Sequence, residues 1–328
     1  MKMHRLSVVI AIGLVLAASG AHAQTPSKVY RIGLLSPLAP LADTSAYGAG
    51  LIRGLAQHGY TLDRNLVFER RGAEMHLDRL PRFVEELVAS KVDVIVTISY
   101  PAALAAKQGT STVPVVVIGG GDPVGTGLVA SLARPGGNVT GISEVETELS
   151  TKRLELLKEA VPSLRRVAML WNANDLGMTL RYKAAAAAAQ ALGVLVQSLG
   201  VREPEDFDEA FAAMTRDMPD GILMVSDALT NLNRKRVFDF AAAHRLPAIY
   251  ENKPSVRDGG LMSYGPDQGE MAVRAAALID RILRGMKPAD LPVEQPVSFE
   301  LIVNLKTAKA LGIEIPPSIL VRADEVIE

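Results

Sequence analysis

The 328-residue chain contains no cysteine, which excludes disulfide bonds, zinc–thiolate sites, iron–sulfur clusters and cysteine nucleophiles. Histidine is also scarce. Beyond the first 23 residues only His58, His76 and His244 occur, scattered without the spacing of metal ligands. We therefore expect no metal and no cofactor. A basic excess is missing as well, because the formal net charge is −1, and this argues against a nucleic acid partner.

Recognisable catalytic motifs are absent too. The sequence has no G-x-S-x-G elbow, no Walker A loop and no H-E-x-x-H pair. One dinucleotide-like pattern, G-x-G-x-x-A, spans Gly125–Ala130, with Glu144 further along. It follows a fourth predicted strand rather than the first strand–helix junction, so it is a weak indication of nucleotide binding. An exported enzyme remains an alternative, without a motif to support it.

The N-terminus has the pattern of a secretory signal peptide. Lys2 and Arg5 precede an apolar block, Leu6–Ala18. The A-x-A cleavage motif Ala21–Ala23 follows this block. A transmembrane anchor is the alternative, but a spanning helix needs about 20 apolar residues. We expect residues 1–23 to be cleaved and the remaining chain to be periplasmic.

Apolar, β-branched runs alternate with helical patterns along the rest of the chain. Several runs are nearly continuous in Val, Ile and Leu, as in strands that are buried on both faces. This alternation predicts parallel sheets covered by helices on both faces. The predicted strands are Val29–Leu35, Leu66–Arg70, Val92–Ile98, Val115–Ile118, Val139–Ile142, Arg166–Trp171, Val194–Leu199, Gly221–Val225 and Pro247–Tyr250.

The alternation occurs twice, over about 28–140 and 141–250, and changes after Tyr250. The remaining elements, a short run at 260–264, a helix at 267–284 and an extended segment at 288–303, are too few for a third domain. We expect them to complete the two sheets. The fold class is then α/β, with two doubly wound parallel-sheet lobes, a hinge of several crossovers and a cleft between the lobes.

Candidate ligand-binding residues follow the predicted strands, because ligands of open parallel sheets bind beyond the carboxyl ends of the strands. These candidates are polar, aromatic or helix-starting residues. They are Ser36, Pro37, Ser99, Tyr100, Pro101, Ala102, Asp122, Asn172, Asp227 and Tyr250.

The segment from Ser99 to Ala102 offers the clearest chemistry. Pro101 suits the first turn of a helix, whose free amides can hold a carboxylate or phosphate. Plain helix capping is the alternative reading of this segment. Asp122 and Asp227 can accept an ammonium group, or can serve as turn and N-cap residues. Tyr100 and Tyr250 can form aromatic walls.

Several segments resemble one family, the ABC-transporter substrate-binding proteins of the tryptophan/tyrosine-type group. The longest is GDPVGTGLVASLARPGGNVTG at 121–141. Others are RIGLLSP at 31–37, PAALAAK at 101–107, KRLELLK at 152–158, GLMSYG at 260–265 and DLPVEQP at 290–296.

This resemblance implies the type I periplasmic binding fold with three crossovers. Lobe 1 would comprise 28–140 plus 260–288, and lobe 2 would comprise 141–259 plus 289–328. It also implies a small solute, with an aromatic or other apolar amino acid as one candidate, and a membrane permease of an ABC importer as partner. A sensor subunit that presents its ligand to a membrane receptor remains an alternative. Monomer is the default expectation.

Overall fold

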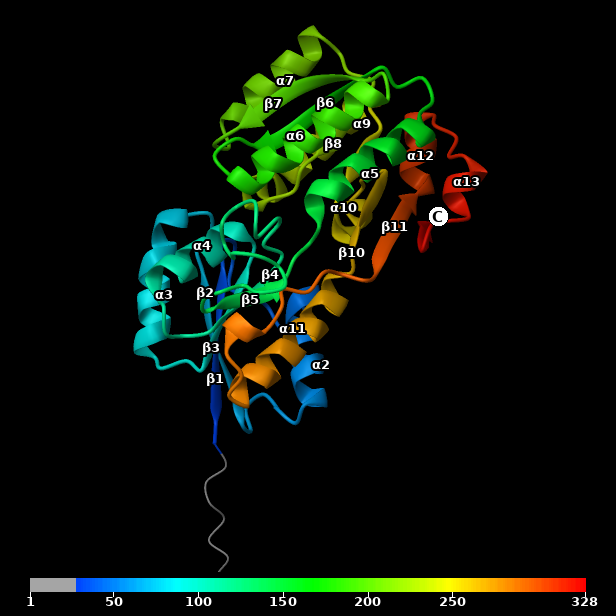
Figure 1. The fold of residues 1–328 in the computed structure, drawn as a ribbon. Helices are drawn as coiled ribbons and strands as arrows, with labels where there is room; N and C mark the ends of the chain where they lie inside the picture. The colour runs from blue at the N-terminus through cyan, green and yellow to red at the C-terminus, as the bar shows by residue number, and fades with distance from the viewer. Residues whose placement is uncertain (1–27) are drawn as a thin grey trace, which may run out of the picture.

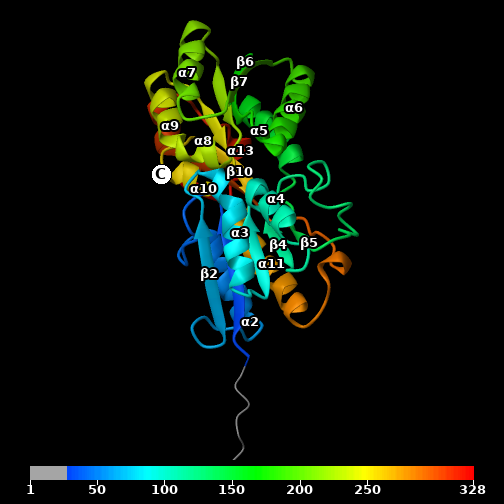
Figure 2. The ribbon, with the colours of Figure 1, turned by 90° about the vertical axis from the view of Figure 1, so that its left-hand side faces the viewer.

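The computed structural model describes residues 28–328, so the predicted signal peptide lies outside the described residues. Figures 1 and 2 show two α/β lobes stacked end to end. Lobe 1, the lower one, is built on a parallel sheet of order β2-β1-β3-β4-β5. Its strands are β1 (Tyr30–Ser36), β2 (Leu66–Gly72), β3 (Val94–Ile98), β4 (Val115–Ile118) and β5 (Val139–Ile142).

Helices cover both faces of the lobe 1 sheet. One face carries α3 (Leu80–Ala89), preceded by a 3₁₀ turn (Leu77–Arg79), and α4 (Tyr100–Gly109). The other face carries α2 (Ala46–Gln57) and α11 (Gln268–Leu283), which lie far apart in the sequence. Glycine on α2 permits their close approach, since a Cβ at Gly54 would lie 2.7 Å from the Cβ of Ala276.

Lobe 2 contains a seven-stranded sheet of order β12-β11-β10-β9-β8-β6-β7. All neighbours are parallel except β10 and β11, which are antiparallel. The strands are β6 (Arg166–Asn172), β7 (Leu195–Val201), β8 (Gly221–Met224), β9 (Ala248–Tyr250), β10 (Met262–Pro266), β11 (Phe299–Asn304) and β12 (Glu325–Ile327).

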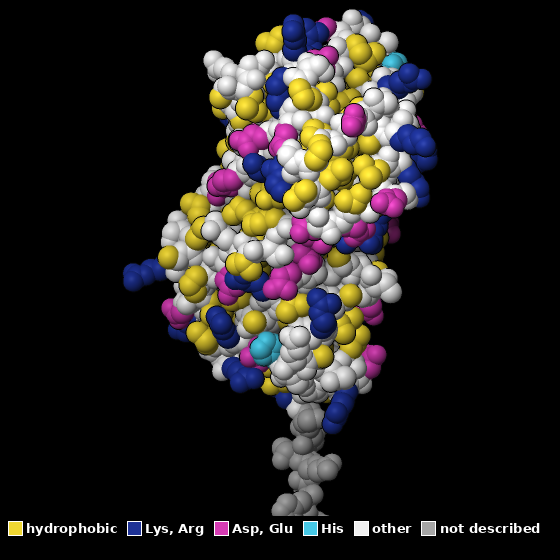
Figure 3. Space-filling model, turned by 90° about the vertical axis from the view of Figure 1, so that its right-hand side faces the viewer, with side chains coloured by type: hydrophobic (Ala, Val, Ile, Leu, Met, Phe, Trp, Pro, Cys, Tyr) yellow, Lys and Arg dark blue, Asp and Glu magenta, His cyan; other side chains and the backbone are white. Residues whose placement is uncertain are grey.

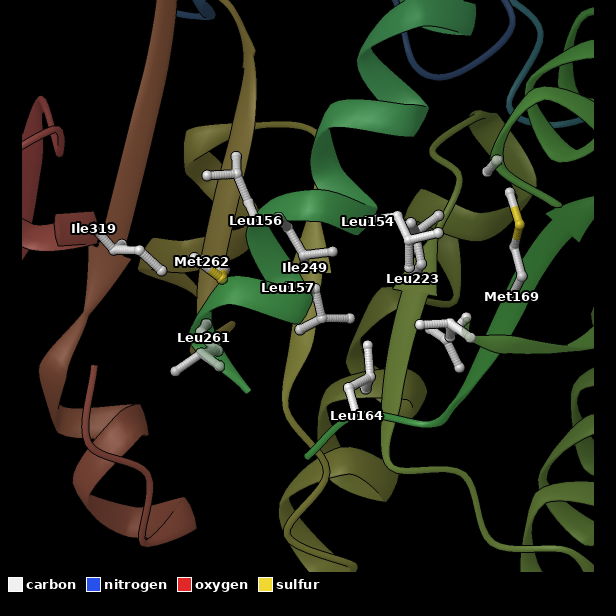
Figure 4. Close-up of a cluster of buried hydrophobic side chains, with 14 of the residues drawn as sticks. Leu154, Leu156, Leu157, Leu164, Met169, Leu223, Ile249, Leu261, Met262 and Ile319 are labelled. Carbon is white, nitrogen blue, oxygen red and sulfur yellow. The ribbon is translucent and has the colours of Figure 1, made fainter. Parts of the chain in front are cut away.

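The helices of lobe 2 also cover both faces of its sheet. On one face, leucines of α5 pack over the sheet strands, with Leu157 near Ile249 in Figure 4. That layer consists of α5 (Glu146–Ala160), α6 (Leu176–Ala191), α12 (Leu305–Leu311) and α13 (Pro317–Leu320). The opposite layer consists of α7 (Asp206–Arg216), α8 (Ala228–Leu232) and α9 (Arg234–Ala243). The short α10 (Lys253–Arg257) contacts β10 and β11.

The predicted α/β fold class is confirmed, and each of the nine predicted strands overlaps an observed one. The positions at which the chain passes from one lobe to the other differ from expectation. Residues 262–266 form β10 in lobe 2, not in lobe 1. A 3₁₀ turn at Pro288–Asp290 and the segment to Glu294 lie against β5 of lobe 1, since the amide of Glu294 donates to the carbonyl of Gly141. The expectation failed because the sequence pattern of a short strand does not reveal its partner.

The chain crosses between the lobes three times: after β5, between β10 and α11, and between Glu294 and β11. The space-filling view shows acidic side chains gathered at the waist between the lobes (Figure 3). Within residues 28–328, the structure contains no helix with the length and apolarity needed to span a bilayer.

Candidate functional site

A cavity of about 430 Å³ lies between the two lobes, at the carboxyl ends of strands from both sheets. This volume falls in the range of small-molecule sites. The cavity takes lining residues from both lobes and from the crossovers, so a bound solute would touch all three. Of the ten predicted site residues, six line it. They are Ser36, Pro37, Ser99, Tyr100, Pro101 and Asp227.

The lobe 1 wall carries no charged side chain among the residues that line it before Gly121. It is formed by the loop after β1, by the start of α4 and by Gly119–Gly121 after β4. Ser99 has φ 71°, which is uncommon for a residue with a side chain. Its hydroxyl makes no capping bond to α4, and its Oγ is buried without a partner in the described structure. Helix capping therefore does not occupy this hydroxyl.

The other four predicted residues do not line the cavity. Ala102 is fully buried in the core behind the wall. The carboxylate of Asp122 accepts from the amides of Val124 and Gly125, so it acts as a turn residue. Tyr250 is buried and packs edge-on against Phe238, with ring centroids 5.0 Å apart.

Asn172 supports the site from behind. Its Nδ2 donates to Oδ2 of Asp227 at 2.6 Å. The same aspartate is the N-cap of α8, and its Oδ1 accepts from the amide of Thr230 at 2.8 Å. Asp227 thus lines the cavity with a carboxylate that already accepts hydrogen bonds. Burial raises its pKa.

A cluster of buried charges forms the opposite wall, and none of its members is among the residues predicted from the sequence. Three glutamates surround two arginines at the hinge. Arg153 Nη1 lies 2.6 Å from Glu146 and 3.1 Å from Glu251. Arg181 lies 3.2 Å from Glu251 and 3.3 Å from Glu144. Of these five residues, all except Arg153 line the cavity.

Burial governs the electrostatics of this cluster. The side chains of Arg153 and Arg181 are 1% and 4% exposed. Burial and the neighbouring Glu146 raise the pKa of Glu251 to about 7. The same two causes raise the pKa of Glu144. The hydroxyl of Tyr47 on α2 donates to Glu144 at 3.3 Å and joins the cluster to lobe 1. Burial first and Glu144 second raise the pKa of this tyrosine.

Helical spacing could have revealed the two arginines. Arg153 lies on the buried stripe of α5, with Leu149, Leu156 and Ala160 at intervals of four, three and four. Arg181 lies on the stripe of α6 that includes Met178 and Ala185. A charged residue on an apolar stripe is rarely buried unless it is paired, so these positions indicate buried acidic partners.

The chain is similar to known proteins over most of its length. A family model described as ABC transporter substrate binding protein matches residues 42–327. A curated "Tyrosine-binding protein" of Clostridioides difficile (strain R20291) is 27% identical over 297 residues, covering 90% of this chain and 85% of the relative.

Solved structures agree with the family model. The ABC domain in complex with L-Trp from Streptococcus pneumonia has a TM-score of 0.85 and 28% identity, covering 92% of this chain and 100% of that one. A ligand-free, open structure of a substrate-binding protein with adhesive properties from Clostridium difficile has a TM-score of 0.67 and 24% identity, covering 91% and 99%. The whole-chain similarity is thus higher to the ligand-bound structure than to the open one.

Proposed function

This chain belongs to the family of ABC transporter substrate-binding proteins, and we propose that its inter-lobe cavity binds an aromatic amino acid for delivery to a membrane permease. The observation that carries the proposal is one cavity with two unlike walls: an uncharged wall of apolar residues and serines, and a wall rich in carboxylates. A zwitterion with an apolar side chain matches both walls. The family is one of substrate-binding proteins and not of enzymes, and its members function outside the cytoplasm.

The start of α4 is the proposed site for the ligand carboxylate. A helix N-terminus presents free amides and a partial positive charge. The unpartnered Ser99 hydroxyl lies there, and Pro101 in the first turn is compatible with helix geometry. Together the amides of the first turn and the Ser99 hydroxyl can hold one carboxylate.

Apolar residues supply the surface for a ligand side chain. The loop after β1 contributes prolines and leucines, α4 contributes Tyr100, and α6 contributes Met178. Tyrosine can pack against an aromatic ligand ring, and methionine can contact such a ring through its sulfur. The relatives named for tyrosine and L-Trp support an aromatic ligand of this kind. The loop residues are Pro37, Leu38, Pro40 and Leu41.

Closure of the lobes would accompany binding. Arg181 of lobe 2 already reaches Glu144 at the hinge, which in turn accepts from Tyr47 of lobe 1. A solute that touches both walls stabilises the closed form through contacts that the open form lacks. The proposal includes a cleaved signal peptide, a periplasmic location and a monomeric state.

Calorimetry on the purified protein tests the proposal. Because such proteins can retain ligand, the sample is unfolded in guanidinium chloride, dialysed and refolded before titration with L-tyrosine, L-tryptophan and L-phenylalanine. We expect saturable binding, and thermal stabilisation of about 2.7 kcal/mol at 100 times the Kd. Glycine and L-glutamate serve as ligand controls. No binding and no thermal shift with any aromatic amino acid at millimolar concentration would refute the proposed ligand class.

A further inference from the structure

The hinge cluster contains one carboxylate more than its arginines can neutralise. Glu146 lies near both arginines, at 2.6 Å from Arg153 and 3.8 Å from Arg181. Glu251 also bridges both, at 3.1 Å and 3.2 Å. Glu144 reaches only Arg181, at 3.3 Å. Three carboxylates therefore share two guanidinium groups, and Glu144 is the carboxylate that contacts only one of them.

Glu144 is also the most accessible member of the cluster. Its side chain is 16% exposed, against 3% for Glu146 and 8% for Glu251, and it lines the cavity. Gly119 across from it leaves room for the carboxylate, because a Cβ at that glycine would lie 2.5 Å from Oε1 of Glu144. The carboxyl group with the fewest contacts to the arginines therefore lines the space that a ligand would occupy.

Asp227 is less suited to bind a cation, although the sequence made it the candidate. Its carboxylate accepts from the Thr230 amide at 2.8 Å, from the Thr230 hydroxyl at 3.0 Å and from Asn172 at 2.6 Å. These three short hydrogen bonds occupy acceptor sites of Asp227, whereas Glu144 accepts only from Tyr47 and Arg181, at 3.3 Å each. Glu144 therefore retains more acceptor capacity for a ligand ammonium.

We propose that Glu144 accepts the ammonium group of the ligand and makes the cavity select for solutes that carry one. This inference rests on the proposed function. A solute without an amine would leave the surplus carboxylate unpaired, and its own carboxylate would add a second negative charge. Sites that hydrogen-bond a substrate group reject analogues that lack it by large factors. An amine without a carboxylate would lose only the contacts at the start of α4.

Three probes and three variants test this inference. L-tyrosine, tyramine and 3-(4-hydroxyphenyl)propionate are titrated into the unaltered protein, Glu144→Gln, Asp227→Asn and the control Glu155→Gln. The control removes an exposed carboxylate of α5 that pairs with Lys152 outside the cavity. For the unaltered protein we expect the affinity to fall in the order L-tyrosine, tyramine, propionate analogue, with the last at least 100-fold weaker than the first.

The variants separate binding from structure. Glu144→Gln should weaken L-tyrosine at least 30-fold, yet leave the propionate analogue unchanged or tighter, because a repulsive charge is gone. Asp227→Asn should lower the affinity for L-tyrosine less than Glu144→Gln does. Glu155→Gln should leave this affinity within 2-fold of that of the unaltered protein. Equal loss for both ligands in Glu144→Gln would mean a structural role and overturn the inference, as would a larger loss in Asp227→Asn.

Failure of the inference differs from failure of the proposed function. If the unaltered protein and Glu144→Gln bind L-tyrosine equally well, the function stands and the inference falls. If the unaltered protein binds none of the aromatic amino acids, the proposed ligand class falls and the inference falls with it.

Discussion

The two walls of the cavity are built by different means. The lobe 1 wall consists of uncharged residues at strand ends and at the start of α4, among them Ser36 and Ser99 and the apolar residues of the loop after β1. The opposite wall depends on long charged side chains, two of them arginines in the bodies of α5 and α6. The neutral wall is therefore a local product of strand–helix junctions. The charged wall exists only once the helices of lobe 2 have packed on its sheet.

The largest expected effect comes from breaking the charged wall. Arg181→Met removes the guanidinium that three glutamates share, leaving buried carboxylates uncompensated. We expect the free energy of unfolding to fall by about 3–5 kcal/mol, measured by denaturant titration without ligand. Arg82→Met is the matched control. It breaks an exposed pair with Glu86 and should cost about 0.5 kcal/mol or less. A loss below about 1 kcal/mol for Arg181→Met would show that the cluster does not depend on this residue.

A pH profile tests whether only the charged wall titrates. Burial raises the pKa of Glu251 to about 7 and also raises that of Glu144, so Glu251 in the empty cluster is partly protonated near neutral pH. A bound ammonium stabilises the ionised carboxylates, so binding releases protons and affinity rises with pH, by at most about tenfold per pH unit per proton. The groups that face this pair are Tyr47, Glu146, Arg153 and Arg181.

Calorimetry of L-tyrosine binding between pH 5.5 and 8, in buffers of different ionisation enthalpy, measures this proton release. Glu251→Gln should flatten the profile, because it removes the carboxyl whose pKa is about 7, whereas Ser99→Ala should shift the profile without changing its slope. An affinity independent of pH in the unaltered protein would contradict the prediction.

A smaller effect is expected at the neutral wall. Ser99→Ala removes a hydroxyl that has no partner in the described structure. The free energy of unfolding should change little, whereas L-tyrosine affinity should fall about 3- to 10-fold, the value of one hydrogen bond. Ser318→Ala, which removes a hydroxyl that donates to Glu159 on the outside of lobe 2, is the control and should leave affinity unchanged. Equal affinities for the two variants would remove Ser99 from the site.

The smallest effect is expected at Tyr250, the aromatic wall that the sequence suggested. Tyr250→Phe preserves the packing against Phe238 and does not touch the cavity. Affinity for L-tyrosine should stay within about 2-fold by calorimetry. A tenfold loss would mean that the wall of the site extends to β9.

The sequence predicted the neutral wall better than the charged one, for a physical reason. Strand ends and helix starts follow from local periodicity, and ligands bind beyond the carboxyl ends of parallel strands, so the sequence predicts Ser36 and Ser99. At β9 the predicted residue was Tyr250, but alternation along the strand turns that ring into the core, and the next residue, Glu251, faces the cavity.

Residues that act across the hinge could not be paired from the sequence. Arg181 meets Glu144 and Glu251 only in the folded protein, where the three are separated by 37 and 70 positions in the chain. The membership of β10 in lobe 2 has the same cause, because strand pairing is a long-range property.

The placement of α11 on α2 has a consequence for biogenesis. The N-terminal lobe receives one of the two helices on this face of its sheet from residues 268–283, far along the chain from α2. Until that segment leaves the ribosome or the export channel, the apolar side of α2 with Gly50 and Gly54 has no helical partner. Lobe 1 therefore cannot complete its folding during synthesis until α11 is available to pack on α2.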